Sequence, residues 1–427
     1  MPFRAKYKRL PSDRQPSCPH GPTVLFETVT DHKKFFACSA FRDRKGCSFY
    51  ELKEDFDKNP RKSRIANKRI KVSNNRRLKR ILELKPKNRR YCKDCSLLLP
   101  ADEQLSHQKH QLLQQVADKS ILFPISNLLS SKSVDKHEAQ YSFAGESKAF
   151  ILNQLEQRGL KRVICMGTPA IHEAIQSCDN STGTDTLLMD IDHRIAQFYP
   201  RSKFVWFNMF NHFFLEGESG EKRLDRFIGS SRGKEIALVV DPPFGGFIEL
   251  LSQTVNFLFD KIRSLHNVQQ IPVILCLPFF LSSFVSKTLP SLKMSEYRVQ
   301  YTNHSKYKKT SSPVRIFTNI PLKDFVLPAE AGYKFCSHCQ KSVPDFANHC
   351  GQCKSCTAFG NNPAFHCPDC KRCVKSSLKH CKKCNKCLPL QHEHGVGRDK
   401  QSGAAARKKA PQGASRKQGP DQRQKQK

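Results

Sequence analysis

The nineteen cysteines of this chain gather in segments near its two ends and leave its middle with few metal-type ligands. Most of them occur as pairs separated by two residues, with histidines close by. This spacing is typical of tetrahedral zinc sites, in which each metal binds four thiolate or imidazole groups. We therefore expect small zinc-stapled modules arranged around one larger domain.

The first cysteine segment, residues 16–52, predicts one zinc site built from three thiolates and one imidazole. Aromatic and basic residues lie between the ligands. This arrangement resembles the GRF-type zinc finger, a small module that grips single-stranded nucleic acid. A zinc staple for a domain too small to fold otherwise is the simpler role, and the two roles are compatible. The expected ligands are Cys18, His20, Cys38 and Cys47.

A second zinc pattern, of the Cys2His2 type, occupies residues 91–112 after a basic linker at residues 53–90. The linker is rich in charge and poor in bulky apolar residues, so we expect most of it to be flexible. We expect the two histidines on a polar helix, where residues three apart share one face and reach the same metal. Docking against a neighbouring domain is the expected role. The ligands would be Cys92, Cys95, His107 and His110.

The third cysteine segment, residues 333–395, offers sixteen potential ligands, enough for four tetrahedral sites. It repeats the pattern His-Cys-x2-Cys-x2-Cys, which implies that successive repeats share ligands. The sequence therefore does not decide which four residues bind one metal. A scaffold is the usual role of such a cluster, and direct RNA contact is the alternative. The ligands are Cys336, Cys339, His349, Cys350, Cys353, Cys356, His366, Cys367, Cys370, Cys373, His380, Cys381, Cys384, Cys387, His392 and His394.

Between the zinc segments, residues 135–325 alternate apolar runs with amphipathic stretches. This is the rhythm of β-strands and helices in a parallel sheet, so we expect a Rossmann-like α/β core. The expected strands are residues 162–169, 186–192, 203–211, 236–240 and 271–278, closed by a hairpin of residues 297–301 and 313–320.

Two strand ends in this core carry residues suited to a nucleoside cofactor. Gly167 ends the first strand and lets a ligand approach the backbone. Asp190 ends the second strand, where doubly wound sheets hold ribose hydroxyls with a carboxylate. Taken singly, a turn glycine and a helix cap are the alternatives. Taken together, they indicate a ligand site at the carboxyl edge of the sheet.

The fourth strand breaks on Asp241-Pro242-Pro243-Phe244, a rigid acidic corner. An exocyclic amine or amide nitrogen is a poor nucleophile that must be gripped and oriented. Asp241 and a backbone carbonyl of the proline pair can accept its two N–H bonds, and Phe244 offers a face for a flipped base. The corner therefore indicates methyl transfer to an amino nitrogen. A plain turn that ends a strand is the alternative.

Charge points to a polyanionic partner, because Lys and Arg exceed Asp and Glu by 35. Part of this charge lies in residues 58–90 and in a basic tail at residues 396–427, which we expect to be disordered. No apolar run is long enough to cross a bilayer, and the N-terminus lacks a secretory signal. We expect an intracellular protein with reduced thiols, no membrane partner and RNA as its ligand.

Together these motifs resemble the class I S-adenosylmethionine-dependent methyltransferases that modify amino nitrogens. More closely, the order of GRF finger, Cys2His2 finger, methyltransferase core and Cys/His-rich region is similar to the CCHC zinc-finger ribosomal-RNA adenine-N6 methyltransferases. Further matches are residues 139–143, 188–192, 208–212 and 312–320. The resemblance implies an enzyme that forms N6-methyladenosine in large-subunit (28S) ribosomal RNA, with S-adenosylmethionine and zinc as cofactors.

The resemblance also implies roles for individual residues. Asp241, Pro242, Pro243 and Phe244 would hold the target adenine. The cofactor would lie between two groups of residues, with Asp190 on its ribose and Asn208 and Met209 at its adenine. The cofactor-binding residues would be Gln140, Tyr141, Ser142 and Phe143 on one side and Gly167, Asp190, Asn208, Met209 and Asp241 on the other.

In one respect the chain departs from this family. No cysteine follows Cys387, so we expect the chain to lack the zinc knuckle of pattern Cys-x2-Cys-x4-His-x4-Cys that names the family. This leaves the chemistry intact and the delivery of the RNA substrate open.

Partners and location follow from the resemblance as further expectations: a ribosomal RNA stem-loop, ribosome-assembly factors or an RNA helicase, and the nucleus or nucleolus, with the cytoplasm as a second compartment. The alternative functions are a protein glutamine methyltransferase, whose amide nitrogen poses the same chemical problem, and a non-catalytic zinc-scaffolded RNA-binding adaptor.

Overall fold

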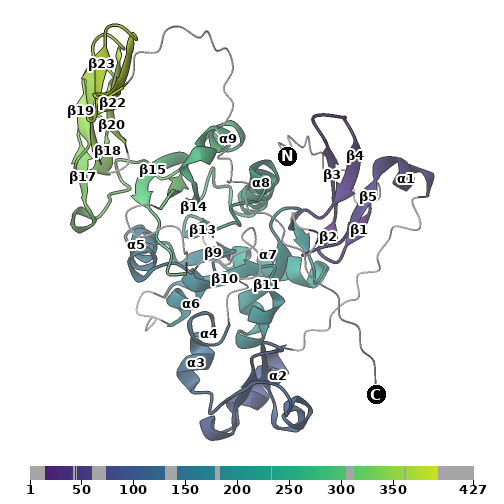
Figure 1. The fold of residues 1–427 in the computed structure, drawn as a ribbon. Helices are drawn as coiled ribbons and strands as arrows, with labels where there is room; N and C mark the ends of the chain where they lie inside the picture. The colour runs from purple at the N-terminus through teal and green to yellow at the C-terminus, as the bar shows by residue number, and fades with distance from the viewer. Residues whose placement is uncertain are drawn as a thin grey trace, which may run out of the picture.

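A computed structural model shows an α/β core that carries three zinc-ligand modules (Figure 1). The residues it describes are 15–41, 44, 46–59, 74–129, 142–177, 183–231, 233–303, 312–359 and 362–392. None of the helices in these ranges is long and apolar enough to span a membrane.

The core is built on one eight-stranded sheet of order β12-β11-β10-β9-β13-β14-β16-β15. Its middle strands β11, β10, β9, β13 and β14 are parallel, and β12, β16 and β15 run antiparallel to their neighbours. The chain starts the sheet at its centre with β9 and builds outward in both directions, which confirms the Rossmann-like prediction. The strands are β9 (Arg162–Met166), β10 (Asp185–Asp190), β11 (Phe204–Asn208), β12 (Phe213–Phe214), β13 (Ile236–Val240), β14 (Val273–Pro278), β15 (Lys293–Arg298) and β16 (Val314–Thr318).

Helices cover both faces of this sheet, because alternate residues of each buried strand pack on opposite sides. In β9, Val163 and Cys165 pack in the cluster that contains α5 and α6, whereas Ile164 and Met166 pack in the cluster that contains α7 and α8. Fully burying each such side chain contributes roughly 1.5–3 kcal/mol. The core helices are α5 (Gly145–Glu156), α6 (Pro169–Ser177), α7 (Glu218–Gly229), α8 (Ile248–His266) and α9 (Ser282–Thr288).

The predicted closing hairpin forms, but its first strand lies earlier than expected. β15 ends at Arg298, its pairing with β16 contains an irregularity, and Tyr301 instead forms an isolated bridge with Phe143. The difference matters because the residues after β15 turn toward the carboxyl edge of the central strands.

The first zinc module lies beside the β12 edge of the sheet, whereas the C-terminal module lies beside the opposite edge, near β15 (Figure 1). Strand β3 of the first zinc module supplies Val24 and Phe26 to the apolar cluster that contains residues of α7 and α8. The elements are β1 (Ser17–Cys18), β2 (Gly21–Pro22), β3 (Val24–Glu27), β4 (Lys34–Ala37), β5 (Tyr50–Leu52) and α1 (Lys53–Lys58).

The second zinc module packs through helix α2 (Asn74–Leu82), so the prediction of a flexible linker is wrong for this stretch. Leu78 and Ile81 lie three residues apart on one helix face and are buried in the main core cluster. The Arg89 side chain caps the C-terminal end of α2 by donating hydrogen bonds to the carbonyl of Ile81, in the last turn, and to the carbonyl of Leu84, just after the helix. The module continues with β6 (Arg90–Cys92), β7 (Leu97–Leu99), β8 (Leu112–Gln114), α3 (Asp118–Leu122) and α4 (Pro124–Asn127).

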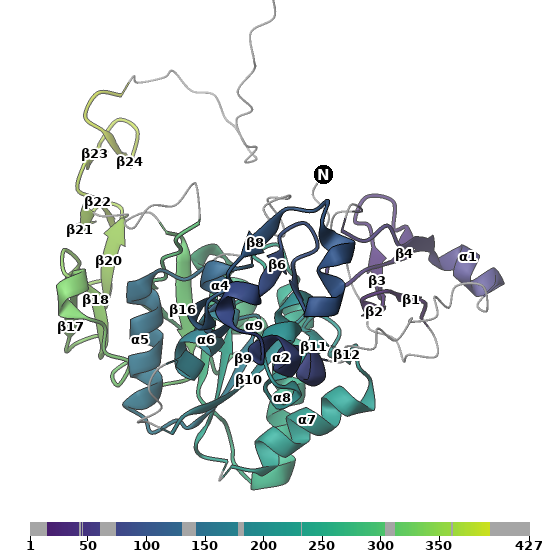
Figure 2. The ribbon, with the colours of Figure 1, turned by 90° about the horizontal axis from the view of Figure 1, so that it is seen from below.

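The C-terminal module is a row of short antiparallel strands that extends away from the core (Figures 1 and 2). It contacts the core where β18 lies against β15 and Lys341 pairs with Glu296. The strands are β17 (Tyr333–Cys336), β18 (Lys341–Pro344), β19 (Asn348–Cys350), β20 (Ser355–Phe359), β21 (Asn362–Cys367), β22 (Arg372–Lys375), β23 (Leu378–Cys381) and β24 (Lys386–Pro389).

Candidate active site and zinc centres

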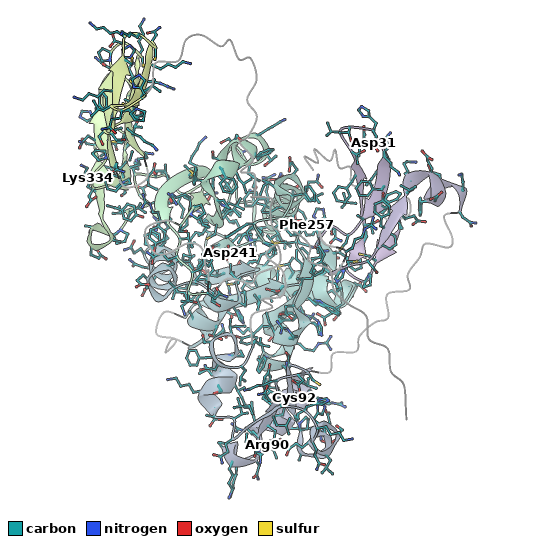
Figure 3. The ribbon with its side chains drawn as sticks, viewed as in Figure 1. Asp31, Arg90, Cys92, Asp241, Phe257 and Lys334 are labelled. Carbon is teal, nitrogen blue, oxygen red and sulfur yellow. The ribbon has the colours of Figure 1, made fainter. Side chains whose placement is uncertain are left out.

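A cavity of about 390 Å³ opens at the carboxyl ends of β9, β10, β11 and β13. This volume lies within the usual range for small-molecule and cofactor sites. Gly167, Asp190 and Asp241, which end three different strands, all line it. The cavity therefore contains both the carboxylate predicted to bind ribose and the corner predicted to bind an amine. Asp241 of that corner is labelled in Figure 3.

Gly167 has a left-handed backbone, with φ of +65°, and atoms of Met209 and Asp241 lie close to the position that a side chain would occupy. A Cβ at this position would lie 2.6 Å from the Met209 Cε and 3.0 Å from the Asp241 carbonyl oxygen. Glycine is required here both for its conformation and for the space that a side chain would fill.

Two carboxylates lie at the end of β10, and the structure separates their roles. Asp192 is bound by the Arg194 guanidinium at 2.6 and 2.9 Å and caps the following 3-10 helix. Asp190 is the last residue of β10 and accepts a 2.8 Å hydrogen bond from the Asp192 backbone amide, and both residues line the cavity. Asp190 is therefore the better candidate for ribose hydroxyls.

The carboxylate of Asp241 is held by a residue that sequence reasoning missed. The Tyr301 hydroxyl donates a 2.9 Å hydrogen bond to Asp241 Oδ1 from a position 60 residues later in the chain. Burial raises the pKa of Asp241 well above its usual range, and the bond from Tyr301 partly opposes that rise. No spacing rule links the two residues, and only the turn of the chain after β15 brings them together.

The backbone carbonyl groups of Pro242 and Pro243 have different roles. The Pro243 carbonyl accepts a 2.8 Å hydrogen bond from the Gly246 amide and closes the turn. The Pro242 carbonyl is therefore the better candidate to accept the second N–H of an amine. Phe244 is half-buried, lines the cavity and lies edge-on to the Tyr301 ring, with centroids 6.0 Å apart. It is placed to contact a base.

Other predicted cofactor residues fall into three groups. Asn208 and Met209 line the cavity. Ser142 and Phe143 are not among the described residues that line it; Phe143 stacks on Tyr301 instead, with centroids 5.1 Å apart. Gln140 and Tyr141 lie outside the described residues.

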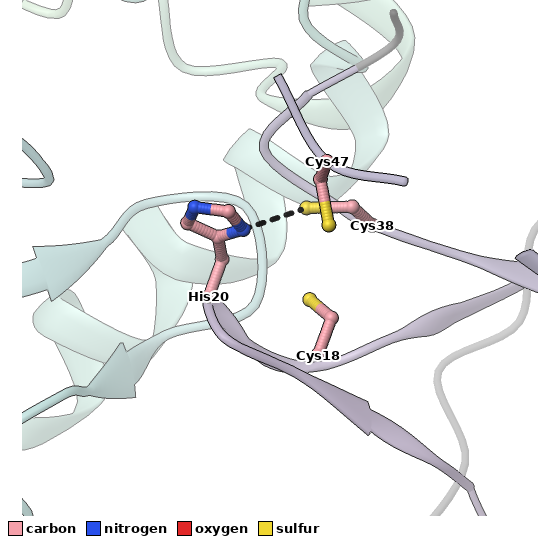
Figure 4. A group of neighbouring side chains, drawn as sticks. All are labelled: Cys18, His20, Cys38 and Cys47. Carbon is pink, nitrogen blue, oxygen red and sulfur yellow. Dashed lines mark hydrogen bonds between the residues drawn. The ribbon is translucent and has the colours of Figure 1, made fainter. Parts of the chain in front are cut away.

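The first predicted zinc site is assembled as expected (Figure 4). The ligand atoms of Cys18, His20, Cys38 and Cys47 all lie within 4.8 Å of one another, and the three cysteines are buried. Three thiols and an imidazole so close together fit a tetrahedral zinc ion.

The second site is also assembled, although its histidines do not lie on a helix face as predicted. His107 ends a 3-10 turn and His110 follows in the next turn, and their Nδ1 atoms lie 3.1 Å apart. Cys92 and Cys95 complete the set. Gln197 fixes the module to the core by accepting from the Leu98 amide at 2.7 Å, which supports docking against a neighbouring domain.

The C-terminal module resolves the ligand pairing that its sequence leaves open. Each site takes two cysteines from one repeat and a histidine and the last cysteine from the next. In the last repeat, Cys384 lies 3.7 Å from His392, and His394 lies outside the described residues. The three complete sets are Cys336, Cys339, His349 and Cys356; Cys350, Cys353, His366 and Cys373; and Cys367, Cys370, His380 and Cys387.

A shared backbone turn explains why the cysteine pairs can bind metal. In three pairs the second cysteine's amide points at the first cysteine's sulfur at 3.4 Å. In these three pairs and in two others, the residue after the second cysteine adopts a left-handed conformation, with φ between +49° and +51°. This turn directs both thiols to one side, as a zinc site requires. The left-handed residues are Ser96, Gln340, Lys354, Lys371 and Asn385.

Comparison with known proteins agrees with this geometry. Residues 134–322 match the family model described as "Probable N6-adenine methyltransferase". The chain is 38% identical over 371 residues to the rRNA N(6)-adenosine-methyltransferase ZCCHC4 of Homo sapiens, a match that covers 82% of this chain and 72% of the human protein.

The ZCCHC4 proteins of two further species are similar. The Xenopus tropicalis protein is 36% identical over 366 residues, which cover 79% of this chain and 74% of that protein. The Mus musculus protein is 38% identical over 366 residues, which cover 80% and 70%. The chain therefore belongs to the N6-adenine methyltransferase family that includes the ZCCHC4 rRNA N(6)-adenosine-methyltransferases.

Proposed function

We propose that this protein transfers the methyl group of S-adenosylmethionine to N6 of an adenine in large-subunit (28S) ribosomal RNA. One observation carries the proposal: a single cavity joins the ribose-type carboxylate Asp190 to the Asp-Pro-Pro-Phe corner at Asp241. Family membership makes the chain an S-adenosylmethionine-dependent methyltransferase, and its similarity to rRNA N(6)-adenosine-methyltransferases supports the ribosomal substrate.

The corner would bind the target amine through two acceptors. Asp241 and the Pro242 carbonyl accept its N–H bonds, which directs the nitrogen lone pair out of conjugation with the ring. Phe244 contacts the flipped base, whose removal from a stem costs a few kcal/mol. Holding the nitrogen in this way is the main task, because an in-line displacement depends on alignment.

The bound cofactor supplies an activated methyl group on a sulfonium. Asp190 would hold its ribose, and Gly167 lets it lie against the backbone of the first strand. Tyr301 would orient the Asp241 carboxylate and favour its charged form, since the hydroxyl donates to Oδ1.

The positive charge of the chain favours an RNA substrate over the alternative of a protein glutamine substrate. Lys and Arg exceed Asp and Glu by 35 in the whole chain, and phosphate neutralisation is the common use of such an excess. The zinc modules surround the core on several sides and would hold the RNA stem-loop (Figure 1). Ribosome-assembly factors or an RNA helicase would be further partners, and the nucleolus the expected location.

The test is the transfer of labelled methyl groups from S-adenosylmethionine to three separate substrates: unmodified 28S ribosomal RNA, 18S ribosomal RNA and a protein extract. Digestion of the product to nucleosides or amino acids identifies the labelled group. We expect label in N6-methyladenosine from 28S RNA. Label in methylglutamine would favour the protein substrate, and cofactor binding without any transfer would favour the adaptor.

A further inference from the structure

We propose that the first zinc module forms the adenine-side wall of the cofactor cavity, so that its metal site and the cofactor are bound as one unit. The contact is made by His20 and Phe41. The inference rests on the proposed function only for the identity of the cofactor.

The order of the strands places the two ends of the cofactor. The transferred methyl group must face Asp241 at the end of β13, and the ribose must lie near Asp190 at the end of β10. Since β9 lies between these strands, a cofactor that spans them continues in the same direction to β11. Its adenine then lies beside Asn208 and Met209.

The cavity is lined by the first zinc module as well as by the core. Pro19, His20, Ala40 and Phe41, all from this module, line the same cavity as Asp190. Phe41 is half-buried and lies edge-on to the His20 ring, with centroids 4.5 Å apart. An aromatic ring next to an adenine site offers a stacking or edge contact to the purine.

His20 joins the metal site to the core through two different groups. Its ring belongs to the first zinc-ligand set, and its backbone carbonyl accepts hydrogen bonds from Asn208 at 2.9 Å and Asn211 at 3.3 Å. A shift of His20 on loss of zinc would therefore disturb the hydrogen bonds that its carbonyl accepts from Asn208 and Asn211 at the end of β11.

The side chain of Asn208 is committed to this junction. It is 1% exposed, and its amide donates to the His20 carbonyl and to the Ser39 hydroxyl at 3.0 Å. Its oxygen accepts from the Phe210 amide at 3.0 Å. Asn208 is thus a positioning residue that shapes the adenine end by holding the module, and the purine contact falls to its neighbours.

The module is docked too closely to act as a loose flap. Gly21 has φ of +100°, and a Cβ there would lie 2.5 Å from the Phe213 ring. Phe26 packs on Phe247 of the core, with ring centroids 5.2 Å apart. The wall is therefore present before the cofactor binds.

The first experiment uses the unmodified full chain. Hydrogen exchange is measured by mass spectrometry with and without S-adenosylhomocysteine, the product form of the cofactor. We expect slower exchange in residues 18–41 of the zinc module as well as in residues 188–192 and 206–210 of the core. Slower exchange confined to the core would overturn the inference.

The second experiment compares two aromatic variants of the same module by calorimetric titration of S-adenosylhomocysteine. Phe41→Ala should weaken binding at least about tenfold, the loss expected for one good ring contact. Tyr50→Ala is the matched control, because Tyr50 stacks on Phe35 and does not line the cavity. It should bind within twofold of the parent.

An unchanged affinity in Phe41→Ala would contradict the inference, whether or not the variant keeps its zinc by elemental analysis. Complete absence of S-adenosylhomocysteine binding to the parent protein would instead contradict the proposed function. The two failures are therefore distinct.

Discussion

Tyr301 donates a 2.9 Å hydrogen bond to Asp241 Oδ1 and so connects the loop after β15 to the acidic corner after β13. The bond has a consequence for the pH dependence of the reaction. Burial raises the pKa of Asp241 well above its usual range, and the hydrogen bond from Tyr301 lowers it again in part.

The pH profile of methyl transfer should therefore respond to Tyr301. The carboxylate form of Asp241 accepts the amine, so kcat/KM should rise with pH as Asp241 loses its proton. Tyr301→Phe removes the contact that lowers this pKa, which moves the rising limb to higher pH. A limb at the same or lower pH in Tyr301→Phe would show that the hydroxyl does not act on Asp241.

Asp241 should also limit the stability of the folded protein near neutral pH. Because its folded-state pKa is raised, its contribution to stability is present below the unfolded pKa and is lost as pH rises through the folded value. Asp241→Asn should raise Tm at pH 7.5 by roughly 2–4 °C, equivalent to about 1 kcal/mol, and have no such effect in acid. Asp260→Asn is the control, because Asp260 is exposed on α8. An equal gain at both pH values in Asp241→Asn would refute this account.

Gly167→Ala should weaken cofactor binding as well as stability. The left-handed backbone costs an alanine about 1–2 kcal/mol, and the new Cβ would press on Met209 and on the Asp241 carbonyl. Gly183→Ala separates the two effects, since Gly183 has a similar φ of +63° and no described atom within 4 Å. Both variants should lower Tm, but only Gly167→Ala should lose affinity for S-adenosylhomocysteine, by about tenfold or more. Equal affinities would show that the cofactor does not approach Gly167.

Zinc counts by native mass spectrometry test the offset pairing of the C-terminal ligands. Cys336 and Cys356 belong to one site, so the double substitution Cys336→Ser and Cys356→Ser should remove one zinc. Cys353 and Cys356 lie in one sequence repeat but in two sites, so their double substitution should remove two. Loss of a single zinc from the second pair would mean that each repeat binds its own metal.

The sequence predicts the parts of the site that depend on local pattern. Gly167, Asp190 and Asp241 each end a buried strand, and parallel strands bring such ends to one edge, where a single cavity contains all three. The metal ligands are predictable for the same reason, because cysteine spacing reflects a local turn.

What the sequence does not predict depends on contacts between distant segments. Tyr301 reaches Asp241 only because the chain turns after β15, and His20 reaches Asn208 from 188 residues away. The pairing of zinc ligands depends on how one hairpin stacks on the next. Helix α2 is not predicted because its segment is rich in basic residues, which are typical of a flexible linker. Leu78 and Ile81 nevertheless have the spacing of a buried helix face.

The most direct measurement compares the parent chain with Asp241→Ala in the transfer of labelled methyl to unmodified 28S ribosomal RNA, with S-adenosylhomocysteine affinity measured in parallel. Loss of one amine acceptor should reduce formation of N6-methyladenosine by at least about 100-fold, the effect of misplacing a reacting group. Parent-like formation of N6-methyladenosine by Asp241→Ala would contradict the assignment of this corner as the catalytic site.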